Sequence, residues 1–135
     1  MKARCLCGVT QFEVQLRNHE VAACHCSMCR RQTAGPLMSI DVENINFIDQ
    51  QHLSVFSSSE WGERGFCNMC GTFIFWRIKD HSFANINVFT LEHPPEDLNF
   101  NLEIYVDHQP AFYSFNNQTK KMTEAEVIAL FNSNQ

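Results

Sequence analysis

The chain has 135 residues, 44% of them hydrophobic and 19% charged, which is typical of a globular protein and predicts a single domain spanning residues 1–135. Ten basic residues against 15 acidic ones give a net charge of −5, and no basic tract is present, which argues against a nucleic-acid partner. No apolar stretch approaches the ~20 residues of a membrane helix, and the N-terminus lacks the apolar core of a signal peptide, so we expect a cytoplasmic protein without a membrane partner.

The hydrophobic pattern predicts short strands through most of the chain. Residues 12–16 alternate between apolar and polar, the period of a half-buried strand, and an apolar run at 21–23 leads into Cys24. The same reasoning predicts further strands at 37–42, 53–56, 72–78, 86–88 and 100–106. Many short strands without intervening helices predict a mainly β, antiparallel architecture.

One helix is predicted at the C-terminus. Thr123 followed by Glu126 forms a capping box, a typical helix start. Four apolar residues then fall on one helical face, which should pack across a sheet: Val127, Ile128, Leu130 and Phe131. A single helical turn is also expected to start at Ser27.

The seven cysteines are the most informative feature of the sequence. They lie in three close-spaced groups: Cys5-x-Cys7, Cys24-x-Cys26-x-x-Cys29 and Cys67-x-x-Cys70. Seven is an odd number, and cytosolic proteins rarely keep structural disulfides. The spacing therefore indicates metal ligands.

The first and last pairs together, which we call the outer cysteine group, consist of Cys5, Cys7, Cys67 and Cys70. Four thiolates complete the tetrahedron that zinc prefers and leave no position for a substrate, so this group predicts a structural zinc. Gly71, directly after Cys70, suits the tight turn that would present both sulfurs of that pair to one metal. Free buried thiols, or iron in place of zinc, are the alternatives for this group.

The inner cysteine group, Cys24, Cys26 and Cys29, provides only three ligands. Three protein ligands and one open position are typical of a catalytic zinc, and a substrate thiol in that position would be kept as a nucleophilic thiolate. This partition uses every cysteine. The alternatives are a closed site completed by His25 and a redox-active pair of Cys26 and Cys29.

Three arginines are candidates for binding the carboxylates of a thiol such as glutathione. Arg30 and Arg31 directly follow the inner group, and a helical turn there would direct one inward and the other to solvent. Arg64 precedes the last cysteine pair. A guanidinium binds a carboxylate through two parallel hydrogen bonds, although solvated surface arginines are the simpler interpretation of each.

Three motifs carry a family resemblance: Cys5-Leu6-Cys7-Gly8, Cys24-His25-Cys26-Ser27-Met28-Cys29-Arg30, and Arg64-Gly65-Phe66-Cys67-Asn68-Met69-Cys70-Gly71-Thr72. In this order they resemble the glutathione-dependent formaldehyde-activating enzyme family, over a span from about residue 3 to about residue 113. The resemblance implies several small antiparallel sheets, a structural zinc on the outer cysteine group and a second, exchangeable zinc on the inner one. It also implies that glutathione and formaldehyde are joined as S-hydroxymethylglutathione.

The sequence thus favours a zinc-dependent carbon–sulfur lyase that acts on a thiol adduct, with the inner cysteine group as its catalytic residues. A non-catalytic zinc-stabilised binding module is the alternative, because the family also includes centromere-associated members. A chromatin-binding module should carry a basic surface or tail, and the net charge of −5 favours the enzyme. A zinc store is a third possibility, but it should be rich in cysteine throughout, and the last third of this chain has none.

Overall fold

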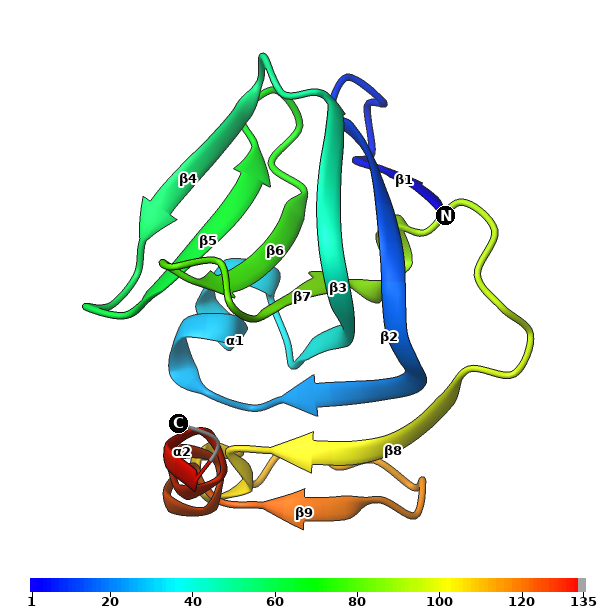
Figure 1. Cartoon of the computed structure of the whole chain (residues 1–135). Coiled ribbons are helices and arrows are strands. Elements are labelled where there is room, and N and C mark those ends of the chain that lie inside the picture. Colours follow the sequence, from blue (N-terminus) through cyan, green and yellow to red (C-terminus); the bar gives the residue numbers. More distant parts are fainter. Residues whose placement is uncertain (134–135) are drawn as a thin grey trace.

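The structure is a computed structural model that describes residues 1–133 (Figure 1). Within that range the elements are β1 (Lys2–Arg4), β2 (Gln11–Cys24), α1 (Ser27–Thr33), β3 (Leu37–Asp49), β4 (Leu53–Ser57), β5 (Gly62–Cys67), β6 (Phe73–Ile78), β7 (Ala84–Asn87), the 3-10 turn η1 (Val88–Thr90), β8 (Asn99–Ile104), the 3-10 turn η2 (Val106–His108), β9 (Lys120–Met122) and α2 (Glu124–Ser133). None of the helices in this part of the chain is long and apolar enough to cross a membrane.

The predicted mainly β architecture with a C-terminal helix is confirmed. One hydrogen-bonded path joins the strands in the order β4-β5-β6-β7-β3-β2-β8-β9, and β1 pairs with β2. Figure 1 shows that β2 turns sharply, so that its C-terminal part runs beside β8, with β9 on the far side of β8, below the other strands. The small sheets expected from the sequence are therefore parts of one continuous, bent sheet.

Two strand pairings differ from the antiparallel expectation. β8 pairs with β2 in parallel, and β9 pairs with β8 in parallel. Parallel neighbours need a long crossover between them. The segment from β3 to β7 forms the crossover between β2 and β8, a long-range arrangement that the local hydrophobic pattern does not encode.

Each predicted strand segment lies in or overlaps an observed strand, but the boundaries differ. The segments 12–16 and 21–23 belong to one long strand, β2, whose pairing with β3 shifts register between Leu16 and Val21. The strand predicted at 86–88 ends at Asn87, because Val88 begins the turn η1. β1, β5 and β9 were not predicted, since they are short or lack apolar alternation.

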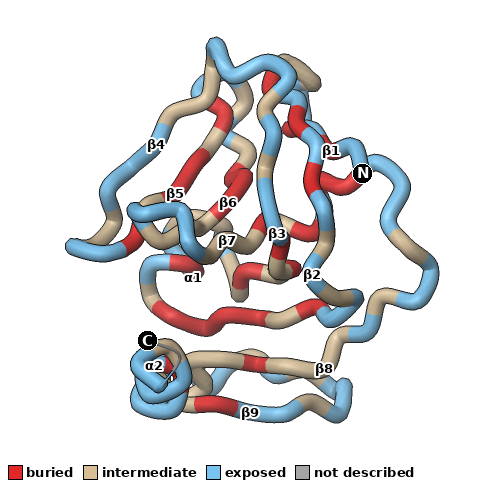
Figure 2. The backbone as a smooth tube through the Cα atoms, viewed as in Figure 1, coloured by how far each residue is buried: buried red, intermediate tan, exposed pale blue. Residues whose placement is uncertain are grey.

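Five of the seven cysteines are buried, in an interior that Figure 2 shows along the strands and around α1, whereas Cys7 is exposed and Cys70 is half-buried. The main core is built from aromatic and aliphatic side chains of the upper strands and includes Cys5 and Cys67. A second cluster holds the inner cysteine group together with Leu37 and Phe73. The charge state of these five buried sulfurs therefore depends on the groups bound to them.

The C-terminal helix α2 begins as predicted. Glu126 N–H donates to Thr123 Oγ1 at 3.3 Å, and Thr123 N–H donates to a Glu126 carboxylate oxygen at 3.1 Å, which completes the capping box. Val127 is buried, but Ile128 and Leu130 are exposed, so only part of the predicted apolar face packs. That face is anchored by Phe131, which contacts aromatic rings of the sheet and its loops: Trp61, Trp76 and Phe83.

Gly65 lies where two strands approach closely. A Cβ atom at this position would lie 2.2 Å from Cε2 of Phe75, a fully buried ring on β6. We expect Gly65→Ala to lower the free energy of unfolding by about 1–3 kcal/mol, because a methyl group there overpacks the core. Urea unfolding measures this change. A matched control is Gly35→Ala, whose Cβ would meet no atom within 4 Å, and equal effects of the two would contradict the prediction.

Candidate metal centres

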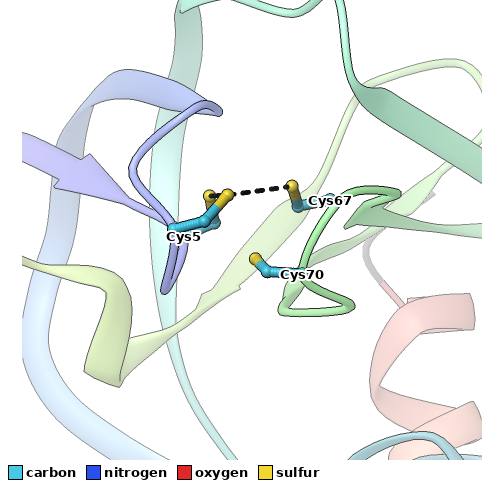
Figure 3. A group of neighbouring side chains, drawn as sticks. Cys5, Cys67 and Cys70 are labelled. Atoms are coloured by element: carbon cyan, nitrogen blue, oxygen red, sulfur yellow. Dashed lines mark hydrogen bonds between the residues drawn. The ribbon is translucent and has the colours of Figure 1, made fainter.

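The outer cysteine group comes together although its two pairs are far apart in the chain (Figure 3). The Sγ atoms of Cys5 and Cys7 are 3.6 Å apart, and those of Cys7 and Cys67 are 4.0 Å apart. With a zinc–sulfur bond of about 2.3 Å, the edge of a tetrahedral site is about 3.8 Å. These four sulfurs, all within 4.8 Å of one another, could therefore hold one tetrahedral metal ion.

Local backbone geometry positions these sulfurs. Gly8 and Gly71, each directly after a cysteine pair, have φ values of +81° and +80°, which only glycine adopts without strain. The Gly71 N–H donates to the carbonyl oxygen of Cys67 at 2.8 Å and closes the turn. The Thr10 N–H also donates to Cys5 Sγ at 3.4 Å. Such N–H donors are expected around sulfurs that carry negative charge.

The inner cysteine group lies where β2 ends and α1 begins. Cys24 is the last residue of β2, and Cys26 caps α1, where its sulfur accepts the Cys29 N–H at 3.3 Å. The three Sγ atoms lie within 4.8 Å of one another, and each residue is at most 8% exposed. All seven cysteines have free thiols. The inner group could therefore hold a metal ion through three sulfurs.

The thiols of the inner group influence each other's protonation. The pKa of the Cys24 thiol is raised, first because it is hydrogen-bonded to Cys26 and Cys29 and also because it is buried. The pKa of the Cys26 thiol is lowered, because the Cys24 and Cys29 thiols and the Cys29 N–H donate to it. Negative charge therefore concentrates on Cys26, which is the state that a metal ligand needs.

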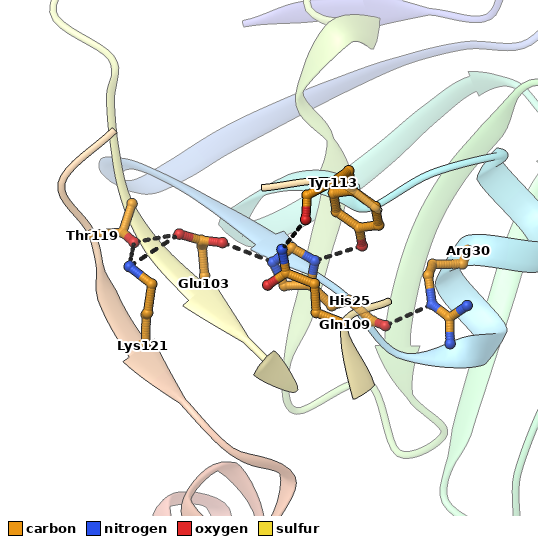
Figure 4. Close-up of polar contacts among 7 residues, drawn as sticks. All are labelled: His25, Arg30, Glu103, Gln109, Tyr113, Thr119 and Lys121. Atoms are coloured by element: carbon orange, nitrogen blue, oxygen red, sulfur yellow. Dashed lines mark hydrogen bonds and ion pairs between the residues drawn. The ribbon is translucent and has the colours of Figure 1, made fainter. Parts of the chain in front are cut away.

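His25 is not a ligand of the inner group, which corrects one alternative from the sequence. Its Nε2 lies 2.8 Å from Glu103 Oε1 and its Nδ1 lies 2.7 Å from the Tyr113 hydroxyl, so both ring nitrogens have partners (Figure 4). His25 is 0% exposed and Glu103 only 1%. The pair anchors the loop between Cys24 and Cys26 to β8.

Sequence reasoning missed Glu103. The apolar alternation in 100–106 predicts that Phe100, Leu102 and Ile104 point inward. In the structure these three are only partly buried, and Glu103, on the opposite face of β8, is the buried residue of the strand. Thr119 also donates to this carboxylate, at 2.5 Å, and Lys121 lies 3.6 Å away. These contacts help to lower the pKa of Glu103 against the opposing effect of burial, so the carboxylate is ionised. A glutamate in a strand gives no local signal of such burial.

The three candidate arginines have different environments. Arg30 is half-buried, and its Nε donates to the His25 carbonyl oxygen at 2.9 Å, whereas Arg31 is exposed. Arg64 is buried on β5, with Nη2 donating to Cys29 Sγ at 3.4 Å. Arg31 and Arg64 line a surface depression of about 300 Å³ beside the inner cysteine group, together with Met28, Gln32, Phe56 and Ser58.

Tyr105 is a second residue that sequence reasoning missed. It packs against the inner cysteine group with φ at +56°, an unfavourable backbone conformation for a bulky residue. Such strain is concentrated at functional sites in proteins. Burial is the main cause that raises the pKa of Tyr105 to about 12, so its hydroxyl is a hydrogen-bond donor.

Comparisons with known proteins give one family match, one sequence relative and one similar solved structure. Residues 1–108 match the family described as glutathione-dependent formaldehyde-activating enzyme. A Schizosaccharomyces pombe protein named as an uncharacterized lyase is 26% identical over 131 residues, which cover 94% of this chain and 93% of that protein. The crystal structure of a Rhodobacter sphaeroides protein is similar with a TM-score of 0.61 and 25% identity, covering 76% of this chain and 99% of that one.

Proposed function

The chain belongs to the glutathione-dependent formaldehyde-activating enzyme family, and from that premise we propose that it is a zinc-dependent carbon–sulfur lyase. Its substrate is the adduct of a thiol, such as glutathione, with an aldehyde, such as formaldehyde. The inner cysteine group is the observation that carries the proposal. Its three clustered sulfurs, beside a surface depression, leave one position for a substrate thiol.

We assign one zinc ion to each cysteine group. The outer group offers four sulfurs and makes a closed, structural site, whereas the inner group offers three and makes an exchangeable site. Zinc in the inner site would supply a coordination position in which a substrate thiol stays deprotonated at neutral pH. This difference in ligand number is what separates the proposed structural role from the proposed catalytic one.

The proposed reaction is the reversible addition of a thiol to an aldehyde. The thiol sulfur forms a bond to the carbonyl carbon, and the carbonyl oxygen takes the proton that the thiol releases; the reverse direction breaks the carbon–sulfur bond. We propose Tyr105, which packs against the inner cysteine group, as the donor of a hydrogen bond to the oxygen that changes charge in this step. Arg31, exposed at the rim of the depression, is the candidate for a substrate carboxylate.

The test is the rate at which the zinc-loaded protein interconverts glutathione, formaldehyde and their adduct, measured by NMR exchange spectroscopy at equilibrium. We expect the wild type to accelerate this exchange. Tyr105→Phe should slow the catalysed rate by roughly 10²- to 10⁴-fold, the range for one positioned proton donor. It should keep the zinc content and thermal stability of the wild type, because the aromatic ring remains.

Tyr113→Phe is the matched control, because it removes the other tyrosine hydroxyl, which is bound to His25. It should slow the exchange far less than Tyr105→Phe. A wild type that holds two zinc ions and leaves the exchange rate unchanged would contradict the proposed function. Equal rates for Tyr105→Phe and the wild type would contradict only the role of Tyr105.

A further inference from the structure

Arg64 is a buried cation with no acidic partner among residues 1–133. Only 4% of the residue is exposed, and its guanidinium lies 5.9 Å from the centre of the Phe73 ring. Nη1 donates to Gln32 Oε1 at 3.2 Å and Nη2 donates to Cys29 Sγ at 3.4 Å, while Nε has no partner. In the described part of the chain, no carboxylate oxygen lies within 4.0 Å of this guanidinium.

This environment requires a negative charge close to Arg64. An arginine side chain keeps its proton at any pH that a folded protein tolerates, and an unpaired buried charge is strongly destabilising. The sulfur of Cys29 is the group in contact with Arg64 that metal binding would make an anion. Three thiolates and one divalent cation sum to a single negative charge, which one guanidinium balances.

The other nearby arginines cannot take this role in the observed arrangement. The Nε of Arg30 is engaged by the carbonyl oxygen of His25, and Arg31 is exposed to solvent, where water screens its charge. Arg64 alone among these three has a hydrogen bond to a sulfur of the inner cysteine group.

We propose that Arg64 is the positioning residue that balances the charge of the inner metal site: it orients the Cys29 sulfur and makes the loaded site electrically neutral. A neutral site retains its metal and still admits an anionic thiol, whereas an uncompensated one would repel it. This inference rests on the inner zinc of the proposed function, but it concerns metal retention and does not depend on the proposed reaction. It also gives the buried Arg64 a role other than contact with a substrate carboxylate.

The experiment measures zinc retention by the fully loaded chain in competition with a chromogenic chelator. Arg64→Met keeps the size and removes the charge, and it should weaken zinc binding at the inner site by roughly 10- to 100-fold, the range for losing a partner of a metal ligand. Zinc at the outer cysteine group should be unaffected. Arg64→Lys should retain zinc better than Arg64→Met. The control Arg31→Met should retain inner zinc as tightly as the wild type.

A second measurement separates this role from simple packing. A Cys26→Ser background loses the inner zinc and with it the metal-bound thiolates, so Arg64→Met should leave the melting temperature unchanged or raise it. In the wild-type background the same change should lower the melting temperature of the zinc-loaded protein. A shift of the same sign and size in both backgrounds would show a packing role only and overturn the proposal.

Three other results would also overturn it. One is a folded Arg64→Met variant that retains inner zinc as tightly as the wild type. Another is a wild type that binds a single zinc under zinc-replete conditions. If Arg64→Met does not fold, Arg64→Lys and Arg64→Gln provide the same comparison, because only the lysine keeps the positive charge. Equal zinc retention by these two variants is the third result that would overturn the proposal.

Discussion

Replacing Cys7 or Cys70 with alanine should leave the chain unfolded or aggregated. Cys7 is exposed and Cys70 only half-buried, so neither change opens a cavity in the core. What each removes is a ligand of the proposed structural zinc. Structural zinc contributes about 10–16 kcal/mol of apparent binding free energy in small domains. That is comparable with or larger than the ~5–15 kcal/mol by which a typical domain is stable.

Circular dichroism and zinc analysis of each purified variant measure this effect. We expect loss of the β-sheet signal and of cooperative thermal unfolding, and the same result when the wild type is stripped by a strong chelator. Met69→Ala is the control, because Met69 lies between the ligands and is 63% exposed. A Cys70→Ala variant that unfolds cooperatively near the wild-type temperature would show that the outer cysteine group is not a structural metal site.

Replacing Cys26 with serine should give a folded protein that has lost its lyase activity and one zinc ion. The serine oxygen can still accept the Cys29 N–H and cap α1, so the local helix start is preserved. Two remaining thiols form a poor zinc site, and the substrate thiol would lose the metal that activates it. We expect the exchange of glutathione and formaldehyde to fall to the uncatalysed rate.

Metal analysis under zinc-replete conditions decides this prediction together with a thermal melt. The expected zinc content is two per chain for the wild type and one for Cys26→Ser. Ser27→Ala, which changes the neighbouring residue and keeps all three sulfurs, should behave as the wild type. If Cys26→Ser unfolds as completely as Cys70→Ala, the inner cysteine group is structural too, and the enzyme interpretation fails.

The sequence by itself determined the grouping of the cysteines and the mainly β class. Close spacings such as C-x-C and C-x-x-C place two sulfurs near one point within a single turn, so a local pattern encodes half of a metal site. Gly71 with φ of +80° and the capping box at Thr123 are also local features, and the structure confirms both. Strands with apolar alternation were predictable for the same reason, because burial of one face has a period of two residues.

Only the tertiary structure decided what surrounds the inner cysteine group. His25 pairs with Glu103 and Tyr113, and Arg64 reaches Cys29, through contacts between residues that are distant in the chain. The parallel pairing of β2 with β8 is what places Glu103 beside the inner group. Neither that pairing nor the positive φ of Tyr105 has a local sequence signal. The energy that selects them comes from burying and pairing charges across the whole fold.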